Sequence, residues 1–428
     1  MHFEIEFTME RMLSSLLLLL CTLIVPAQNV PALEQLQADP RKAYGTDYPY
    51  GFRMEALTPA PLGYKPFYIS LYARHGSRYY HTDRLYKKLD TLLTAAHEKD
   101  LLTGEGEAFY SRYQKTVQEL ITGFGELTEV GWQQHQGIAC TLYNRFPEVF
   151  RKGGNVLAVA SLAGRSVMSM SAFCQELVQC NPRIEIREES SRFTLDAVIP
   201  TYEENPNRRE WPMATGPRCE KRRNVIEMDT TLNKKILTRV FKSTEGLPGN
   251  VRQIPGYLIS LYTSLPSINH EGMMEGILSD GDLVKSWESN NLRTYSDYFR
   301  IQYRTIPILR DIILKADAVL DGSSDRIADL RFGHDNIGAL IVLMGLNGAD
   351  LDPEDPLAVK ECFQNWNICK AANIQLVFYR GRHADDPILV KCLLNGSEVT
   401  LPVATDRFPY YSWSGLKAFY LNRIEAVE

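Results

Sequence analysis

The residues best suited to do chemistry form a short basic cluster, Arg74-His75-Gly76-Ser77-Arg78. The planar guanidinium of arginine matches phosphate or carboxylate oxygens, so two arginines beside a histidine predict an anion site. A neutral imidazole there is a nucleophile facing a phosphorus whose oxygens are already neutralised, as covalent phosphoryl transfer through nitrogen requires. Gly76 would let the backbone approach the anion closely. The alternative is a loop of solvated charges, but average composition gives R-H-G-x-R only on the order of once in a thousand such chains.

Predicted strands position this cluster and further candidate side chains. Three predicted strands, of which the first two are apolar runs typical of buried strands, are each followed within a few residues by a charged or titratable side chain: 66–73 by Arg74, 155–161 by Arg165, and 328–333 by His334 and Asp335. In open α/β sheets, ligands bind in the crevice outside the carboxyl ends of the strands, so these side chains are expected to share one site. A carboxyl group there would supply the proton that a leaving oxygen needs.

The cluster resembles the R-H-G-x-R signature of the histidine acid phosphatases, the branch that includes phytases and multiple inositol polyphosphate phosphatases. Three further segments resemble the family's pattern. The family's L-T-x-x-G-x-x-Q segment is similar to Leu127-Thr128-Glu129-Val130-Gly131-Trp132-Gln133-Gln134, and its third phosphate-binding arginine is similar to Arg165, which precedes Ser166, Ser169 and Ser171-Ala172. The family's H-D proton-donor motif is similar to Gly333-His334-Asp335. Two positions depart from the pattern. Tyr80 replaces a usual proline, which affects the shape of the adjoining pocket, and Asp335 departs from the H-A-E version of many multiple inositol polyphosphate phosphatases.

The resemblance implies a mechanism and a set of roles. His75 would attack phosphorus and become phosphohistidine, and Asp335 would protonate the leaving oxygen and then take a proton from the hydrolytic water. The equatorial phosphate oxygens would be held by Arg74, Arg78, Arg165 and His334. No metal or other cofactor is expected, because guanidinium groups supply the charge that Mg²⁺ supplies elsewhere. The expected partner is a small-molecule phosphate ester, above all an inositol polyphosphate such as phytate.

The implied fold is of the α/β class, a three-layer phosphoglycerate mutase-like sheet domain with an inserted helical cap. We place the α/β domain at residues 40–80, 125–204 and 324–428 and the cap at 81–124 and 205–323. Prolines separate amphipathic stretches in the second cap segment, of which 296–320 is the longest. Two basic groups of the cap could bind further phosphates, although a solvated surface is the simpler interpretation: Arg84, Lys87 and Lys88, and Arg218, Lys221, Arg222 and Arg223.

The C-terminal region predicts the rest of the sheet. Residues 373–380 and 388–394 alternate as strands, and Asn395-Gly396 before 397–401 is a strong hairpin signal. An amphipathic helix over 410–424 is expected to close the domain.

The composition is that of an ordinary globular protein. The 428 residues are 44% hydrophobic and 23% charged, and the formal net charge is −5. No overall positive field would attract nucleic acid, so an anionic substrate needs a local basic pocket. The sequence leaves the oligomeric state unknown.

The N-terminal residues predict export. An apolar run, 13–25, is too short to span a bilayer comfortably and is followed by Val25-Pro26-Ala27, the small-residue arrangement that a signal peptidase reads. We therefore expect a signal peptide over 1–27 and a periplasmic or secreted protein without stable membrane insertion after cleavage. A lipoprotein anchored through Cys21 is the alternative.

The cysteine pattern gives one candidate disulfide. Eight cysteines are present and only Cys21 precedes Ala27, so seven would remain, an odd number that leaves at least one thiol without an internal partner. Cys362 and Cys369 flank a short loop-like stretch and are the candidate pair. The sequence contains no C-x-x-C or H-E-x-x-H, so no zinc site is expected.

Two other functions stay open on the sequence alone. Within the enzymes, the protein could be a sugar-phosphatase or an acid phosphatase of broad specificity. From another class, it could be a non-catalytic envelope protein that only captures anions. The complete set of His75, three arginines and Asp335 argues against the second, because binding alone requires neither a nucleophile nor a carboxylate beside the anion.

Overall fold

The computed structural model describes residues 30–52, 55–199, 230–350 and 358–426. The predicted signal peptide and the basic run 218–223 lie outside these residues. The chain divides into two compact units, residues 1–39 and 40–428. The first contains helix α2 (Ala32–Ala38), and every element described below belongs to the second.

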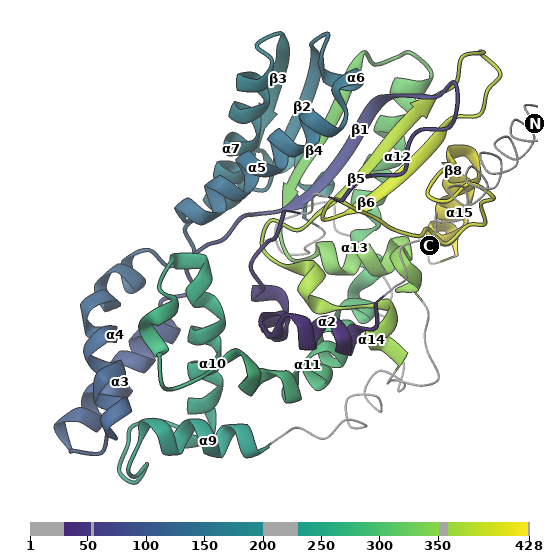
Figure 1. The fold of residues 1–428 in the computed structure, drawn as a ribbon. Helices are drawn as coiled ribbons and strands as arrows, with labels where there is room; N and C mark the ends of the chain where they lie inside the picture. Colours follow the sequence, from purple (N-terminus) through teal and green to yellow (C-terminus); the bar gives the residue numbers. More distant parts are fainter. Residues whose placement is uncertain (1–29, 53–54, 200–229, 351–357, 427–428) are drawn as a thin grey trace, which may run out of the picture. The chain divides into compact units, whose positions relative to one another are not determined.

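One mixed sheet forms the centre of the second unit (Figure 1). The strand order is β3-β2-β4-β1-β5-β6-β7, with β8 also paired to β6. The strands β3, β2, β4 and β1 are parallel, whereas β5 and β6 run antiparallel to their neighbours. The bounds are β1 (Lys65–Arg74), β2 (Gly154–Ala160), β3 (Ile184–Glu189), β4 (Arg326–Gly333), β5 (Asn373–Arg380), β6 (Leu389–Leu394), β7 (Ser397–Glu398) and β8 (Tyr411–Ser412).

Helices cover both faces of this sheet. Side chains of β1 alternate between two cores: Ile69, Leu71 and Ala73 pack with α5 (Glu129–Arg145), α6 (Pro147–Phe150) and α7 (Gly164–Cys180). Tyr68 and Tyr72 instead join the core formed with α11 (Asp280–Ile301), α12 (Ile306–Leu320), α13 (Ile337–Met344) and α15 (Trp413–Glu425). This period of two is that of a strand buried on both faces. The predicted three-layer α/β arrangement is confirmed.

The predicted hairpin is also confirmed. Asn395 and Gly396 both have positive φ, 52° and 83°, between the antiparallel strands β6 and β7. A two-residue hairpin turn of this kind requires positive φ at both central positions, which Asn-Gly tolerates best.

Four helices form a separate group, which we call the cap helices (Figure 1). They pack on one another, α3 on α4 and α10, and α4 on α9. Thr103 caps α4 by accepting a hydrogen bond from the backbone of Gly106 at 3.0 Å. The bounds are α3 (Arg84–Glu98), α4 (Gly104–Thr122), α9 (Thr230–Val240) and α10 (Ile254–Ser264); the short α14 (Val359–Cys362) lies outside this group.

The predicted cap is too long at its C-terminal end. The stretch 296–320 is not one helix, because α11 ends at Ile301 and Pro307 sits in the first turn of α12, where proline is tolerated. Moreover, α12 covers the sheet: its Asp311 accepts a hydrogen bond from the buried Arg331 of β4 at 2.7 Å. The apolar face that suggested a cap helix is therefore the face that α12 buries on the sheet.

The predicted disulfide between Cys362 and Cys369 is wrong. Cys362 is a free thiol at the end of α14. Its Sγ donates a hydrogen bond to the carbonyl of Val359 at 3.4 Å, so the helical turn directs it toward its own backbone. Burial raises the pKa of this thiol to about 11, which keeps it protonated and unreactive near neutrality.

Among the described residues, no helix combines the length and the apolar character needed to cross a membrane.

Candidate active site

Three adjacent strands end together at one edge of the sheet and form the site. Arg74, the last residue of β1, pairs with Gly333 at the end of β4, and Ala160 at the end of β2 pairs with Phe332. The segments that follow line a cavity of about 600 Å³. All six residues predicted from the sequence lie on its wall, together with five others: Arg74, His75, Arg78, Arg165, His334 and Asp335, and His81, Leu162, Ala163, Ile199 and Asn336.

His75 is fixed in one tautomer by its own loop. Its Nδ1 lies 2.9 Å from the carbonyl oxygen of Gly76, and because a carbonyl only accepts, Nδ1 must carry the proton. The unshared electron pair is then on Nε2. Burial, followed by the charges of Arg74 and Arg78, lowers the pKa of His75 well below its ordinary value. The imidazole is therefore neutral and nucleophilic even in mildly acidic solution.

Each of the three arginines has one hydrogen-bond donor that no described residue uses. Among the described residues, the buried Nε atoms of Arg74, Arg78 and Arg165 have no hydrogen-bond partner. An unsatisfied buried N–H typically costs about 1–3 kcal/mol, and a bound anion would remove this cost. Burial, and then the neighbouring Arg74, lowers the pKa of Arg78 to about 10, so it stays charged at physiological pH. Three converging cations with free donors are suited to a dianionic phosphate.

His334 is held in place by two neighbours. Its Nε2 lies 2.9 Å from Oγ of Ser161, and its Nδ1 lies 3.5 Å from an Nη of Arg165. Burial, and then Arg165, lowers the pKa of His334 to about 4, so the ring is neutral above that pH. Since the guanidinium only donates, Nδ1 accepts and the Nε2 proton goes to Ser161. His334 thus orients Arg165, and it would have to release Ser161 to donate to a phosphate.

Asp335 lies on the wall of the cavity. Its side chain is exposed, so water and a leaving group can both reach it. The backbone around it is fixed, because its carbonyl accepts from Gly338 at 2.9 Å as α13 begins. Asn336 secures the same turn by donating from Nδ2 to the hydroxyl of Tyr72 at 2.8 Å. The carboxylate is therefore an exposed group on a fixed backbone.

The L-T-x-x-G-x-x-Q segment packs against the loop that carries His75. Thr128 caps α5 by accepting a hydrogen bond from the backbone of Gly131 at 3.3 Å. A Cβ on Gly76 would meet the carbonyl oxygen of Gly131 at 2.4 Å, so loop and helix touch backbone to backbone. Gln134 then accepts a hydrogen bond from the backbone of Ser77 at 2.9 Å. Close packing on α5 therefore explains Gly76 better than the predicted approach to the anion.

His135, which follows this segment, is a packed core histidine. It is fully buried against Phe332, with ring centroids 5.6 Å apart. Burial lowers its pKa to about 3, so it is neutral. It does not line the cavity.

Comparisons with known proteins identify the fold. No protein-family model matches the sequence, and no curated protein matches it either. The multiple inositol polyphosphate phosphatase of Bifidobacterium longum, solved with inositol hexasulfate, matches over 89% of this chain and 97% of its own, with a TM-score of 0.73 and 17% identity. The fold is that of the histidine acid phosphatases.

Two phytases share this histidine acid phosphatase fold. That of D. castellii matches over 94% of this chain and 88% of its own, with a TM-score of 0.64 and 16% identity. The phytase of Citrobacter braakii matches over 85% of this chain and 98% of its own, with a TM-score of 0.52 and 13% identity. At these identities the likeness concerns the fold, and the chemistry of this chain rests on its own site.

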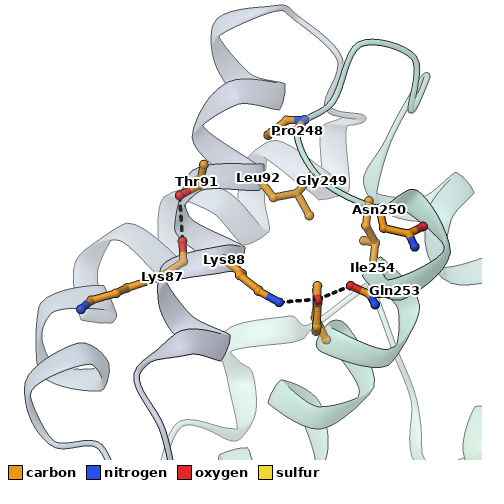
Figure 2. Close-up of a pocket in the computed structure, with 10 residues that line it drawn as sticks. Lys87, Lys88, Thr91, Leu92, Pro248, Gly249, Asn250, Gln253 and Ile254 are labelled. Atoms are coloured by element: carbon orange, nitrogen blue, oxygen red, sulfur yellow. Dashed lines mark hydrogen bonds between the residues drawn. The ribbon is translucent and has the colours of Figure 1, made fainter.

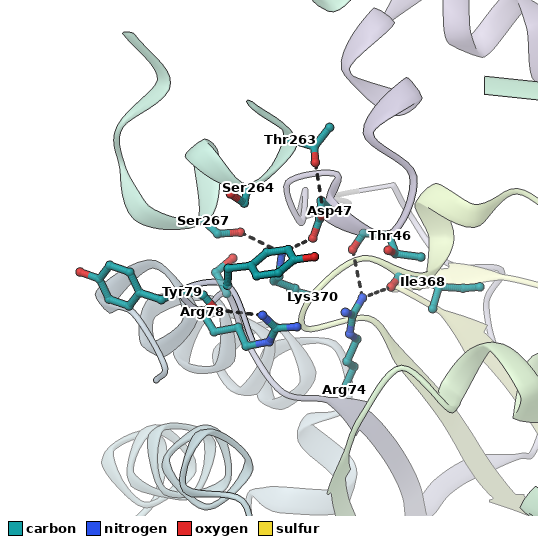
Figure 3. A network of polar contacts seen from close by, with 12 residues as sticks. Thr46, Asp47, Arg74, Arg78, Tyr79, Thr263, Ser264, Ser267, Ile368 and Lys370 are labelled. Atoms are coloured by element: carbon teal, nitrogen blue, oxygen red, sulfur yellow. Dashed lines mark hydrogen bonds and ion pairs between the residues drawn. The ribbon is translucent and has the colours of Figure 1, made fainter. Parts of the chain in front are cut away.

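In this histidine acid phosphatase fold, an ion pair that the sequence did not suggest lies beside Arg74 and Arg78 (Figure 3). Lys370 pairs with Asp47 and also donates to Oγ of Ser267 at 3.2 Å. The lysine side chain is only 4% exposed. Burial alone would raise the pKa of Asp47, but Lys370, Arg74 and Arg78 outweigh it and lower that pKa. The carboxylate is therefore charged and belongs to the cationic cluster of the site.

The same two segments also hold Arg74. An Nη of Arg74 donates to the carbonyl of Thr46 at 3.0 Å and to that of Ile368 at 2.5 Å. Thr46 precedes Asp47, and Ile368 lies two residues before Lys370, so the ion pair joins the two acceptors of Arg74 (Figure 3). No motif marks this pair, because 322 residues separate its members in the chain and only the fold brings them together.

Lys370→Met is expected to weaken phosphate binding. Asp47 would lose its partner and compete with the phosphate for Arg74 and Arg78, so we expect KM and the inhibition constant of inorganic phosphate to rise on the order of tenfold, with a smaller change in kcat. The double variant Asp47→Asn/Lys370→Met removes the competing charge and should restore much of the affinity. Equal affinities for phosphate in the single and double variants would contradict a positioning role.

Lys87 and Lys88 line a different cavity, of about 290 Å³, between α3 and α10 (Figure 2). The amine of Lys88 donates to the hydroxyl of Tyr257 at 2.9 Å, and Lys87 pairs with Asp83. Neither lysine contributes to the wall of the cavity around His75. These contacts favour the solvated helix face over a second phosphate subsite.

Proposed function

We propose that the protein is a histidine acid phosphatase that hydrolyses phosphate monoesters, with inositol polyphosphates such as phytate as its favoured substrates. The observation that carries this proposal is the state of His75: a neutral imidazole, with its proton on Nδ1, faces a cavity that holds three arginines and an exposed carboxylate. Capture of an anion would use the arginines alone. A nucleophile and a proton donor on the same wall are needed only when a bond is broken.

The reaction would proceed in two steps. Nε2 of His75 attacks phosphorus while Arg74, Arg78 and Arg165 bind the oxygens that gain charge, with His334 positioning Arg165. The bond from phosphorus to the ester oxygen breaks, and Asp335 gives that oxygen a proton. Water then attacks the phosphohistidine, Asp335 takes back a proton, and inorganic phosphate leaves with His75 neutral again. Each half of the cycle returns Asp335 to the form that the other half needs.

The size and lining of the cavity support a substrate larger than one phosphate. Its volume of about 600 Å³ is within the usual range of small-molecule sites. His81 widens the polar wall beyond the arginines, and the shared fold includes proteins described as phytases and an inositol polyphosphate phosphatase. We further propose that the protein acts outside the cytoplasmic membrane, on the strength of the export signal predicted at residues 1–27.

The test is phosphate release at pH 5, in the presence of EDTA, from phytate, glucose 1-phosphate, nucleotides, phosphoserine and p-nitrophenyl phosphate. An ordinary histidine with a pKa of about 6.5 would be mostly protonated at pH 5, whereas the lowered pKa of His75 keeps its imidazole neutral. We therefore expect turnover at pH 5 to exceed that at pH 7, because Asp335 must carry a proton to release the leaving group, with phytate the best substrate.

Other results of this assay would indicate one of the alternative functions. Faster release from glucose 1-phosphate would indicate a sugar-phosphatase, and similar rates on all esters a broad acid phosphatase. Saturable binding of phosphate without any turnover would indicate an anion-binding protein. Activity that appears only above pH 8 and is lost in EDTA would contradict the histidine mechanism.

A further inference from the structure

Two cysteines and a glutamate meet on the helical layer that supports the site. Cys140 lies on α5, and Glu176 and Cys180 lie one turn apart at the end of α7. One sulfur or oxygen atom from each of the three residues lies within 4.8 Å of the other two. The side chains are partly exposed, so an ion from solution can reach them. The two helices that carry them pack side by side against the sheet (Figure 1).

We propose that Cys140, Glu176 and Cys180 form a zinc site, with a water as the fourth ligand. Zinc accepts thiolate and carboxylate ligands in tetrahedral geometry. With Zn–S near 2.3 Å and Zn–O near 2.1 Å, a sulfur and an oxygen of such a site lie about 3.5 Å apart. Sγ of Cys180 lies 3.9 Å from Oε1 of Glu176, so small side-chain rotations would complete the geometry.

The surroundings of the cluster fit a cation. Nδ2 of Asn144 donates a hydrogen bond to Sγ of Cys140 at 3.4 Å, the kind of contact that orients a metal-bound thiolate. Two thiolates and a carboxylate would together offset the charge of a divalent cation, and zinc binding would release the thiol protons.

The site would lie far from the cavity around His75. Arg165 and Cys180 lie near opposite ends of α7, and 15 residues at 1.5 Å each place them roughly 22 Å apart along the helix. Zinc would join the far end of α7 to α5, the helix that carries Gly131 and Gln134 under the catalytic loop. Motif searches miss the site because its ligands come from two helices, with a spacing of four residues on one of them.

The experiment measures Zn²⁺ binding by the reduced full chain in competition with a chromophoric chelator. We expect one equivalent of Zn²⁺ with a Kd at or below about 1 µM. Cys140→Ser and Cys180→Ser should each weaken binding at least about 100-fold, and Glu176→Gln about tenfold. Cys362→Ser removes a free thiol elsewhere and should leave the Kd unchanged. Co²⁺ in place of Zn²⁺ should give thiolate-to-metal absorption that the two cysteine variants lack.

Three results would overturn the proposal: no Zn²⁺ uptake by the reduced wild type, uptake retained by the double variant Cys140→Ser/Cys180→Ser, or a Cys140–Cys180 disulfide in the freshly purified protein, which would consume both thiol ligands. Thermal unfolding of each variant without metal distinguishes lost binding from lost folding. Phosphatase activity does not enter the readout, so the outcome is independent of the proposed function.

Discussion

His75→Ala is expected to lose phosphate release by on the order of 10⁴- to 10⁶-fold, the loss typical when a covalent nucleophile is removed. The variant keeps Arg74, Arg78 and Arg165 and should therefore still bind inorganic phosphate. Rapid quenching with ³²P-labelled substrate should trap an acid-labile, alkali-stable label on the wild type and none on the variant. That pattern of stability is the signature of phosphate on nitrogen and separates it from a phosphoserine or an acyl phosphate.

The matched control is His97→Asn, which changes an exposed histidine of α3 whose Nδ1 lies 2.7 Å from Oε2 of Glu107. It should behave as the wild type in both turnover and labelling, because His97 does not line the cavity. Label that persists on His75→Ala with unchanged chemical stability would mean that another histidine is the nucleophile. His81 would then be examined first, as the remaining histidine of the cavity wall apart from His334.

Local patterns were enough to predict the centre of this fold. The strands β1 and β2 are mostly apolar, β4 alternates apolar residues with Asp329 and Arg331, and each of the three leads into a charged turn. Because these three strands are neighbours, their carboxyl ends place Arg74, Arg165 and His334 on one wall. The residues of the site are therefore encoded next to the elements that position them.

Features that depend on distant packing could not be predicted in this way. The edge strand β3 carries the sequence Ile-Glu-Ile-Arg-Glu-Glu, in which only two residues are apolar, so its pattern is that of a polar segment. The apolar face of α12 could pack equally well on cap helices or on the sheet. The contact of Asp311 with Arg331 of β4 shows that α12 packs on the sheet. The pair of Asp47 and Lys370 depends on two loops far apart in sequence. In each case the deciding partner is supplied by the fold.

Asp335→Asn is expected to separate chemistry from binding. If Asp335 only held the substrate, its loss would raise KM and leave kcat nearly unchanged, because ground state and transition state would lose the same interaction. A positioned general acid instead contributes about 10²- to 10⁴-fold, and its contribution grows as the leaving group becomes poorer. We therefore expect kcat on phytate to fall by that factor, since an inositol alkoxide cannot depart without a proton.

The same variant should lose far less on p-nitrophenyl phosphate, whose phenolate leaves readily, so the ratio of the two losses is the decisive measurement. Asp385→Asn is the matched control: Asp385 is exposed in the loop after β5. Because β5 runs antiparallel to β1, this loop lies at the opposite end of the sheet from the site, and both substrates should react normally. Equal losses on the two esters in Asp335→Asn would show that Asp335 acts through its charge alone. The proton would then have to come from His81, which lines the same cavity and whose pKa is lowered by burial and by Arg78.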